Sequence, residues 1–269
     1  MKVKKVFPFS LWLLVLCFFL AACGGDGGGS SSGGGNGGGG SSPTTSNDSP
    51  GKIPGLGNTS GNLQGTSFAL PSGVTLVGNI TDVIVGSSSA LSTSKKERSQ
   101  YSLDPKNILV IGGNYNAEIG SGWIPFKMTL KNSTTAAIKV TFPAGLILTP
   151  VDRKAQNAIL LKETSVTIPS QQTYVIALMM YCGNMERLNP INSIVFEWGV
   201  VSTSTTLKDL IDRLVHKQIN AEDFAYAYDL NYSTRCDKLQ DIVWNLTDNG
   251  VPLSDADKQW IASIPNSNP

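Results

Sequence analysis

The stretch TYVIALMMYC, residues 173–182, consists of β-branched, aromatic and other apolar residues, and Gly183 follows it directly. An apolar run of this length that ends at a turn residue predicts a β-strand. The predicted strand therefore ends on a cysteine, Cys182, which is one of only four in the chain.

Further strand-like segments lie before and after this stretch and are separated by Gly, Pro and Asn. They are VTLVGNITDVIV (74–85, with a hairpin at Gly78-Asn79), NILVIGG (from 107), PFKMTL (from 125), AAIKVTF (from 136), GLILTP (from 145), NAILL (from 157), SVTI (from 165) and SIVFEWGVV (from 193). In AAIKVTF the alternating Ile138, Val140 and Phe142 fall on one face. Short strands about every 10 residues predict an antiparallel, immunoglobulin-like β-sandwich over residues 68–202.

The hydrophobic period changes to that of helices after residue 203. A capping-box pattern at Thr206 and Asp209 precedes apolar residues at helical spacing, from Leu207 to Val215. Three more helices are expected: one opened by Asn220 and Asp223 that carries Phe224 and Tyr228, one from about Arg235 to Asn249 stopped by Gly250, and one capped by Ser254 that carries Trp260 and Ile261. Strands followed by about four helices predict an α+β domain, with the helices of residues 203–269 packed on the sheet.

The N-terminus carries a secretory signal over residues 1–22. Lys2, Lys4 and Lys5 precede an apolar core, and small residues follow it. Leu20-Ala21-Ala22-Cys23 resembles the lipobox of bacterial lipoproteins. That resemblance implies that Cys23 receives a lipid and becomes the first residue of the mature chain, so that the expected partner at this end is the membrane.

Residues 23–67 are expected to be the lipidated cysteine and a disordered tether. From Gly24 to about Gln64 the composition is Gly, Ser, Asn, Thr and Pro with few apolar residues. A flexible coil of about 40 residues has a typical reach of about 35 Å, which clears the lipid headgroups. The folded part is expected to begin near Phe68.

The net charge limits the expected partners, and the residue after Cys23 indicates the membrane to which the protein is sorted. The formal charge of +1 falls to about −2 when the three signal lysines are removed, and no basic stripe remains, so nucleic acid is not expected as a partner. In Gram-negative lipoproteins an Asp after the lipidated cysteine commonly retains the protein at the inner membrane. Gly24 stands there instead, which favours the outer membrane.

Two cysteines, Cys182 and Cys236, remain after Cys17 leaves with the signal and Cys23 is lipidated. An even pair outside the cytoplasm predicts a disulfide between them, with two free thiols as a lesser alternative. Closing a loop of this length would stabilise the fold by roughly 4 kcal/mol in the chain-entropy model.

An alternative role for Cys182 comes from a resemblance. Tyr181-Cys182-Gly183 together with Leu239-Gln240-Asp241-Ile242-Val243-Trp244 is similar to the thioester domains of bacterial surface adhesins. The resemblance implies an internal thioester with sulfur from Cys182 and the acyl group from Gln240. Leu239 and Ile242 depart from the Thr and Ala of that pattern, and Cys236 adds a thiol on the same helix face as Gln240.

No other constellation indicates chemistry strongly. His216, the single histidine, is expected to sit at a helix C-terminus, where a cation is favourable. Gly112-Gly113-Asn114 lacks the rest of a phosphate loop and is expected to be a turn. The aspartates of the last third have no EF-hand spacing. Most aromatic residues are expected in the core, with a ligand platform left open for a set of eight: Tyr174, Tyr181, Trp198, Tyr226, Tyr228, Tyr232, Trp244 and Trp260.

These observations predict a lipid-anchored envelope protein without cofactor or metal. The expected activity is noncatalytic, a binding or structural module that engages an envelope polymer or another protein. A thioester that forms covalent bonds is the alternative, and a hydrolase stays open because catalytic residues distant in sequence are not visible without the fold.

Overall fold

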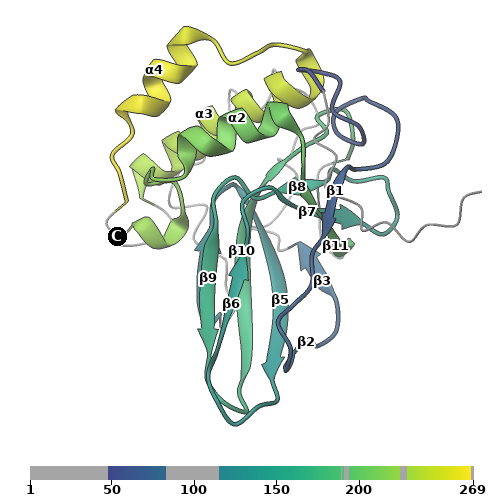
Figure 1. The fold of residues 1–269 in the computed structure, drawn as a ribbon, viewed down its shortest axis with the longest axis vertical. Helices are drawn as coiled ribbons and strands as arrows, with labels where there is room; N and C mark the ends of the chain where they lie inside the picture. Colours follow the sequence, from purple (N-terminus) through teal and green to yellow (C-terminus); the bar gives the residue numbers. More distant parts are fainter. Residues whose placement is uncertain (1–47, 83–114, 189, 191–193, 225–228, 268–269) are drawn as a thin grey trace, which may run out of the picture. The chain divides into compact units, whose positions relative to one another are not determined.

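Strand β10 (Thr173–Cys182) is the strand around which the sheet is assembled in the computed structural model (Figure 1). The structure describes residues 48–82, 115–188, 190, 194–224 and 229–267. One edge of β10 pairs along its length with β5 (Ile124–Asn132). Its other edge pairs with β4 (Ala117–Gly120) and then, at its end, with β8 (Ala158–Ile159).

The remaining elements follow the same strands-then-helices order. The other strands are β1 (Gly65–Ser67), β2 (Val74–Leu76), β3 (Ile80–Asp82), β6 (Ile138–Phe142), β7 (Leu146–Pro150), β9 (Thr164–Ile168) and β11 (Val195–Ser202). The helices are α2 (Thr205–Leu214), α3 (Leu230–Trp244) and α4 (Asp255–Ser263), with a 3₁₀ turn η1 (Ala221–Asp223) and a π-helical turn η2 (Asn245–Asn249).

Six strands close into an antiparallel barrel in the order β5-β3-β11-β7-β8-β10, and β10 pairs with β5 again. The predicted immunoglobulin-like sandwich is therefore wrong. A sandwich keeps two separate sheets, whereas the β5–β10 ladder, which runs from Thr173↔Lys131 to Met180↔Ile124, joins the ends of one sheet. β1, β2 and β4 extend the barrel sheet, and β6 and β9 form a separate ladder.

The predicted hairpin at Gly78-Asn79 is also wrong, although both of its strands form. β2 pairs with β5 through Val74↔Asn132, and β3 pairs with β5 through Thr81↔Lys127. Both pairings are antiparallel, so β2 and β3 run in the same direction along β5 and do not pair with each other. Gly78, at φ 75°, supplies the bend between them.

Alternation along β10 divides the apolar side chains between two cores. Ile176, Leu178 and Met180 point into the barrel. Met179 and Tyr181 point outward into a second cluster made with the helices. The strand is therefore apolar on both faces, because helices cover the outer one.

The helical region has three α-helices among the described residues, not about four. Ser204, rather than Thr206, caps α2 by accepting from the Leu207 N–H. The helix expected at Asn220 is the short turn η1, and Tyr228 lies outside the described residues. α4 begins at the predicted cap, since Asp257 and Ser254 form a capping box.

The third expected helix also differs at its start and its end. α3 begins at Leu230, earlier than the predicted Arg235, with Asp229 as its N-cap. It continues as the π-helical turn η2, which ends at Gly250 in the left-handed region (φ 70°), so the predicted stop is confirmed.

The folded unit begins before the expected boundary at Phe68. Residues 48–64, here called the strap, pack beside the helices and lead into β1, which pairs with β11 (Figure 1). Ile53 and Leu56 of the strap are buried in the helical core. The predicted tether of residues 23–67 is therefore wrong from residue 48 onward, because these two apolar side chains hold the chain to the fold.

Candidate functional site

Gln240 and Cys182 form the most specific contact among the predicted site residues. The Cys182 N–H donates to Gln240 Oε1, and Gln240 Nε2 donates to the Cys182 carbonyl, each at 2.9 Å. The β5 ladder ends two residues earlier, at Met180↔Ile124. The carboxamide therefore satisfies the backbone of Cys182 at the point where the neighbouring strand has ended.

Helix α3 positions Gln240 through its buried face. Tyr232, Cys236, Leu239, Gln240 and Val243 are all buried, at the three- and four-residue spacing of one helix face. Cys236 and Gln240 are one turn apart, as the sequence predicts. Both side chains consequently reach the end of β10, but they contact different residues there.

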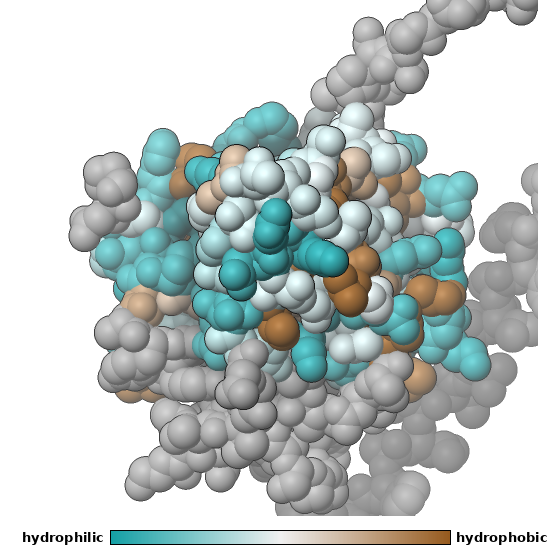
Figure 2. Space-filling view, turned by 90° about the horizontal axis from the view of Figure 1, so that it is seen from below, coloured by the Kyte–Doolittle hydropathy of each residue, from teal (hydrophilic) through white to brown (hydrophobic). Residues whose placement is uncertain are grey.

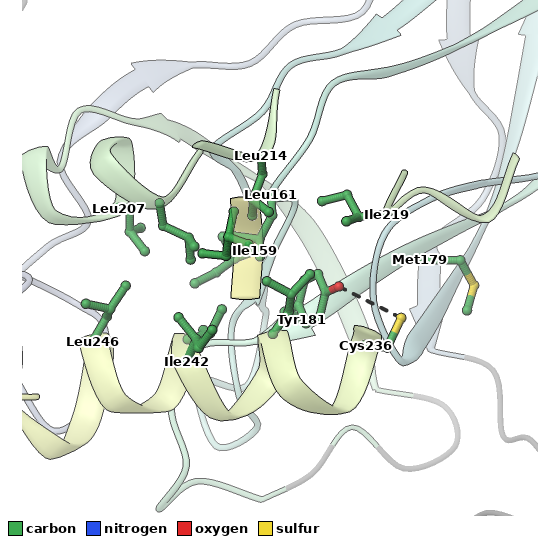
Figure 3. Packing of buried hydrophobic residues seen from close by; sticks show 14 of the residues in the cluster. Ile159, Leu161, Met179, Tyr181, Leu207, Leu214, Ile219, Cys236, Ile242 and Leu246 are labelled. Atoms are coloured by element: carbon green, nitrogen blue, oxygen red, sulfur yellow. Dashed lines mark hydrogen bonds between the residues drawn. The ribbon is translucent and has the colours of Figure 1, made fainter. Parts of the chain in front are cut away.

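Cys236 faces Tyr181 rather than Cys182. The Tyr181 hydroxyl donates to Cys236 Sγ at 3.8 Å, and Figure 3 shows the two side chains pointing toward each other. Successive residues of a strand point to opposite faces, so Cys182 is directed away from the side that Tyr181 shares with α3. Among the described cysteines, Cys182 and Cys236, no disulfide forms, and the predicted bond is wrong in this structure.

Burial keeps the Cys236 thiol protonated. It raises the pKa of Cys236 to about 12, although hydrogen bonds with Tyr232 and Tyr181 lower it in part. Burial likewise raises the pKa values of both tyrosines well above 10. The thiolate is the nucleophilic form of cysteine, so the protonated Cys236 is unreactive at neutral pH.

The same cluster is anchored to the loop between β4 and β5. Tyr232 donates to the Gly122 carbonyl at 2.9 Å and accepts from the Gly122 N–H at 3.3 Å. Gly122 has φ 136°, and a Cβ there would lie 2.2 Å from the Met180 backbone. Glycine is required because the loop passes directly over β10.

Glu222 is a hydrogen-bonded carboxyl group that the sequence interpretation missed; the residue is exposed overall, although its carboxyl group is partly desolvated. It accepts hydrogen bonds from the Gly120 N–H at 2.8 Å, from Asn220 Nδ2 at 3.0 Å and from the Thr164 hydroxyl. Burial raises its pKa above the ordinary value, although these hydrogen bonds lower it in part. It joins η1 to β4 and β9, and nothing in its local sequence distinguishes it from a solvated helix residue.

A buried ion pair lies on the other side of η1. Lys162 Nζ is 3.0 Å from Asp223 Oδ2 and also donates to the Lys217 carbonyl at 2.7 Å and to the Ser267 hydroxyl. Asp223 in turn accepts from the N–H groups of Ile219 and Asn220. The pair therefore holds η1, the end of α2 and the C-terminal residues together.

Other predicted residues do not join this site. His216 is exposed just beyond the end of α2, and its carbonyl accepts from the Ser267 N–H. Tyr181, Tyr232 and Trp244 are buried, so they form no ligand platform. Cys23, Gly112-Gly113-Asn114, Tyr226 and Tyr228 lie outside the described residues. Within residues 48–267, as far as they are described, no three acidic, cysteine or histidine side chains form a metal cluster.

The visible surface offers no single extended apolar patch. On the face shown in Figure 2, apolar residues occur in separate small groups among polar ones. The large exposed apolar residues of the described chain are scattered in sequence: Val77, Val151, Leu188, Val215, Leu230 and Val251. No helix in the described part of the chain is long and apolar enough to cross a bilayer.

Comparisons of the chain with protein-family models, with curated proteins and with solved structures find no match.

Proposed function

We propose that this chain is a lipid-anchored envelope protein whose folded unit is a noncatalytic binding or structural module. The observation that carries the proposal is the reciprocal hydrogen-bonded pair of Gln240 and Cys182. The side chain best placed for bond-forming chemistry is engaged in completing the edge of the sheet. A carboxamide in this role stabilises the fold and has no chemistry to perform.

The other groups that could react support the same proposal. Cys236 is held as a thiol beside Tyr181, and Glu222 accepts three hydrogen bonds from the elements around it. Lys162 and Asp223 are paired with each other. A general base or a nucleophile needs access to a substrate, whereas each of these groups is directed at the protein itself.

The proposed attachment to the membrane depends on Cys23 and its lipobox. Residues 24–47 separate the proposed lipid from Asp48, the first described residue. Gly24 favours the outer membrane of a Gram-negative cell. Display on such an anchor suits a module that engages an envelope polymer or an extracellular protein.

A Cys23→Ser variant tests the anchor. Radiolabelled palmitate is expected to label the wild-type chain and leave the variant unlabelled, and the variant is expected to move from the membrane fraction to the soluble fraction. Undiminished labelling of the variant would contradict the anchor. Saturable binding of purified chain to peptidoglycan sacculi or to outer-membrane vesicles tests the module, and turnover of either material would count against a noncatalytic role.

A covalent thioester is the second candidate, and the closeness of Gln240 to Cys182 favours it. In that reaction Cys182 Sγ attacks Gln240 Cδ, the C–N bond breaks, and ammonia leaves with the thiol proton. The intact mass of the purified chain decides the matter: loss of ammonia, with methylamine taken up at Gln240, supports a thioester. An unchanged mass supports the hydrogen-bonded pair.

A further inference from the structure

The strap runs directly across the residues that follow Cys182. The Gly57 N–H donates to the Gly183 carbonyl at 2.8 Å, and Asn184 Nδ2 donates to the Gly57 carbonyl at 2.9 Å. Leu56 is fully buried, and a Cβ on Gly183 would lie 3.1 Å from its Cδ2 atom. The end of β10 is thus bordered by Gln240 and by the strap.

The strap also presses on the turn that follows the helix of Gln240. The Gly51 N–H donates to the Leu246 carbonyl at 2.7 Å. Gly57 has φ 56°, and a Cβ there would lie 1.9 Å from the Thr247 carbonyl oxygen. Two glycines therefore allow the strap to lie against η2, and it touches the elements that carry both members of the Cys182–Gln240 pair.

The beginning of the strap is held near the surface. Asp48 Oδ1 accepts from the Thr206 N–H at 3.1 Å and from the hydroxyls of Thr205 and Thr206, at the start of α2. A hollow of about 170 Å³ lies next to these contacts and is lined by Pro50, Thr206, Asp209, Leu246, Pro252 and Leu253. Atoms that border a hollow lack contacts on that side, so the strap is packed less tightly here than at Leu56.

We propose that the strap is a movable cover for the Cys182–Gln240 pair, closed in this structure and opened from its Asp48 end. Residue 48 continues into the residues that lead to Cys23, so a pull on the anchor loads the Asp48 contacts first. Release of Asp48, then of Gly51, then of Leu56 and Gly57 uncovers the end of β10 and withdraws Leu56 from the helical core, while the barrel core stays packed. The cover goes beyond the proposed function, and it requires neither a thioester nor a bound ligand.

The test measures hydrogen exchange of the Cys182 amide in the native full chain by NMR, because this N–H belongs to the covered pair. Asp48→Ala removes the acceptor at the start of α2, and Gly57→Ala forces the strap away from Thr247. Either variant is expected to raise the exchange rate of the Cys182 amide about tenfold, with the amides in the middle of β10 unchanged. Gly78→Ala is the matched control, since Gly78 also has positive φ (75°) but a Cβ there meets nothing within 4 Å.

Two results would overturn the proposal. One is an unchanged exchange rate of the Cys182 amide in a folded Asp48→Ala chain. The other is exchange of the Cys182 amide in step with the amides in the middle of β10, which indicates global unfolding. If Gly57→Ala does not fold, the unaltered chain gives the second measurement, and the Gly57 amide is expected to exchange before those of β10. Intact mass is recorded separately, so the thioester and the cover succeed or fail independently.

Discussion

The carboxamide of Gln240 and the backbone of Cys182 close a ring of two hydrogen bonds, each 2.9 Å long. A side chain from the helical layer thereby acts as the missing neighbour of a strand, and it joins α3 to the barrel at the end of β10. Gln240 and Cys182 are both buried, so water does not replace either bond when the ring is broken.

Gln240→Ala is expected to lower the free energy of unfolding by about 3 kcal/mol, because a buried N–H and a buried carbonyl lose their partners. Urea unfolding followed by circular dichroism measures the change. Gln259→Ala is the matched control, since Gln259 is an exposed helical glutamine and its loss is expected to change stability little. Equal stability of both variants would show that the ring contributes nothing.

Gln240→Glu separates hydrogen bonding from side-chain volume. The carboxylate accepts from the Cys182 N–H but repels the Cys182 carbonyl, whereas the protonated acid donates to it. The variant is therefore expected to be destabilised at neutral pH and to regain part of its stability as the pH falls. A pH-independent difference from the wild type would contradict this account.

Cys236 is expected to resist alkylation of the native chain at neutral pH and to react only as the pH approaches its pKa of about 12. Both the folded and the unfolded thiol are protonated at pH 7, so the raised pKa has no effect on stability there. Above the ordinary value of 9.0 the unfolded chain loses this proton first, and the folded state is destabilised as the pH rises. The rate of Cys236 alkylation by iodoacetamide is measured at a series of pH values, and the chain unfolded in urea is the control. Rapid labelling near pH 7 would show that the cysteine is not buried as described.

Glu222→Gln is expected to become relatively more stable than the wild type as the pH rises. The folded-state pKa of Glu222 lies above its ordinary value, so the folded chain holds this proton more tightly than the unfolded chain does. The stability that the proton provides is complete below about pH 4 and is lost as the pH rises through the folded-state pKa. Urea titrations of both proteins between about pH 4 and about pH 7 measure the free energy of unfolding of the variant minus that of the wild type. This difference is expected to grow as the pH rises, and a decrease would contradict the prediction.

Leu56→Ala is expected to destabilise the domain by about 2–5 kcal/mol, because the fully buried side chain leaves a cavity in the helical core. Leu230→Ala is the control, since Leu230 is 69% exposed. Thermal unfolding of both variants measures the effect. The result also tests the domain boundary, because the stability of a fold that began at Phe68 would not change when Leu56 is substituted.

Local patterns identified many elements because the signals act within a few residues of one another. Ser254 as a cap predicts the start of α4, and Gly250 predicts the stop after α3. Alternation in AAIKVTF places Val140 and Phe142 on the buried face of β6. Composition misled at the strap, where two buried apolar residues, Ile53 and Leu56, lie in a stretch of Gly, Pro and Asn.

The sequence by itself determined the order of most strands and helices and the one-turn spacing of Cys236 and Gln240, and it predicts a lipobox at Cys23. Only the tertiary structure decided that β10 pairs back to β5, that Cys236 meets Tyr181 and that Gln240 meets Cys182. The reason is physical: caps and periodicity depend on neighbours along the chain, whereas ring closure and the face to which Cys182 points depend on register between segments about 50 residues apart. A cysteine pair in sequence predicts a bond, but strand alternation sends Cys182 away from the helix that carries Cys236.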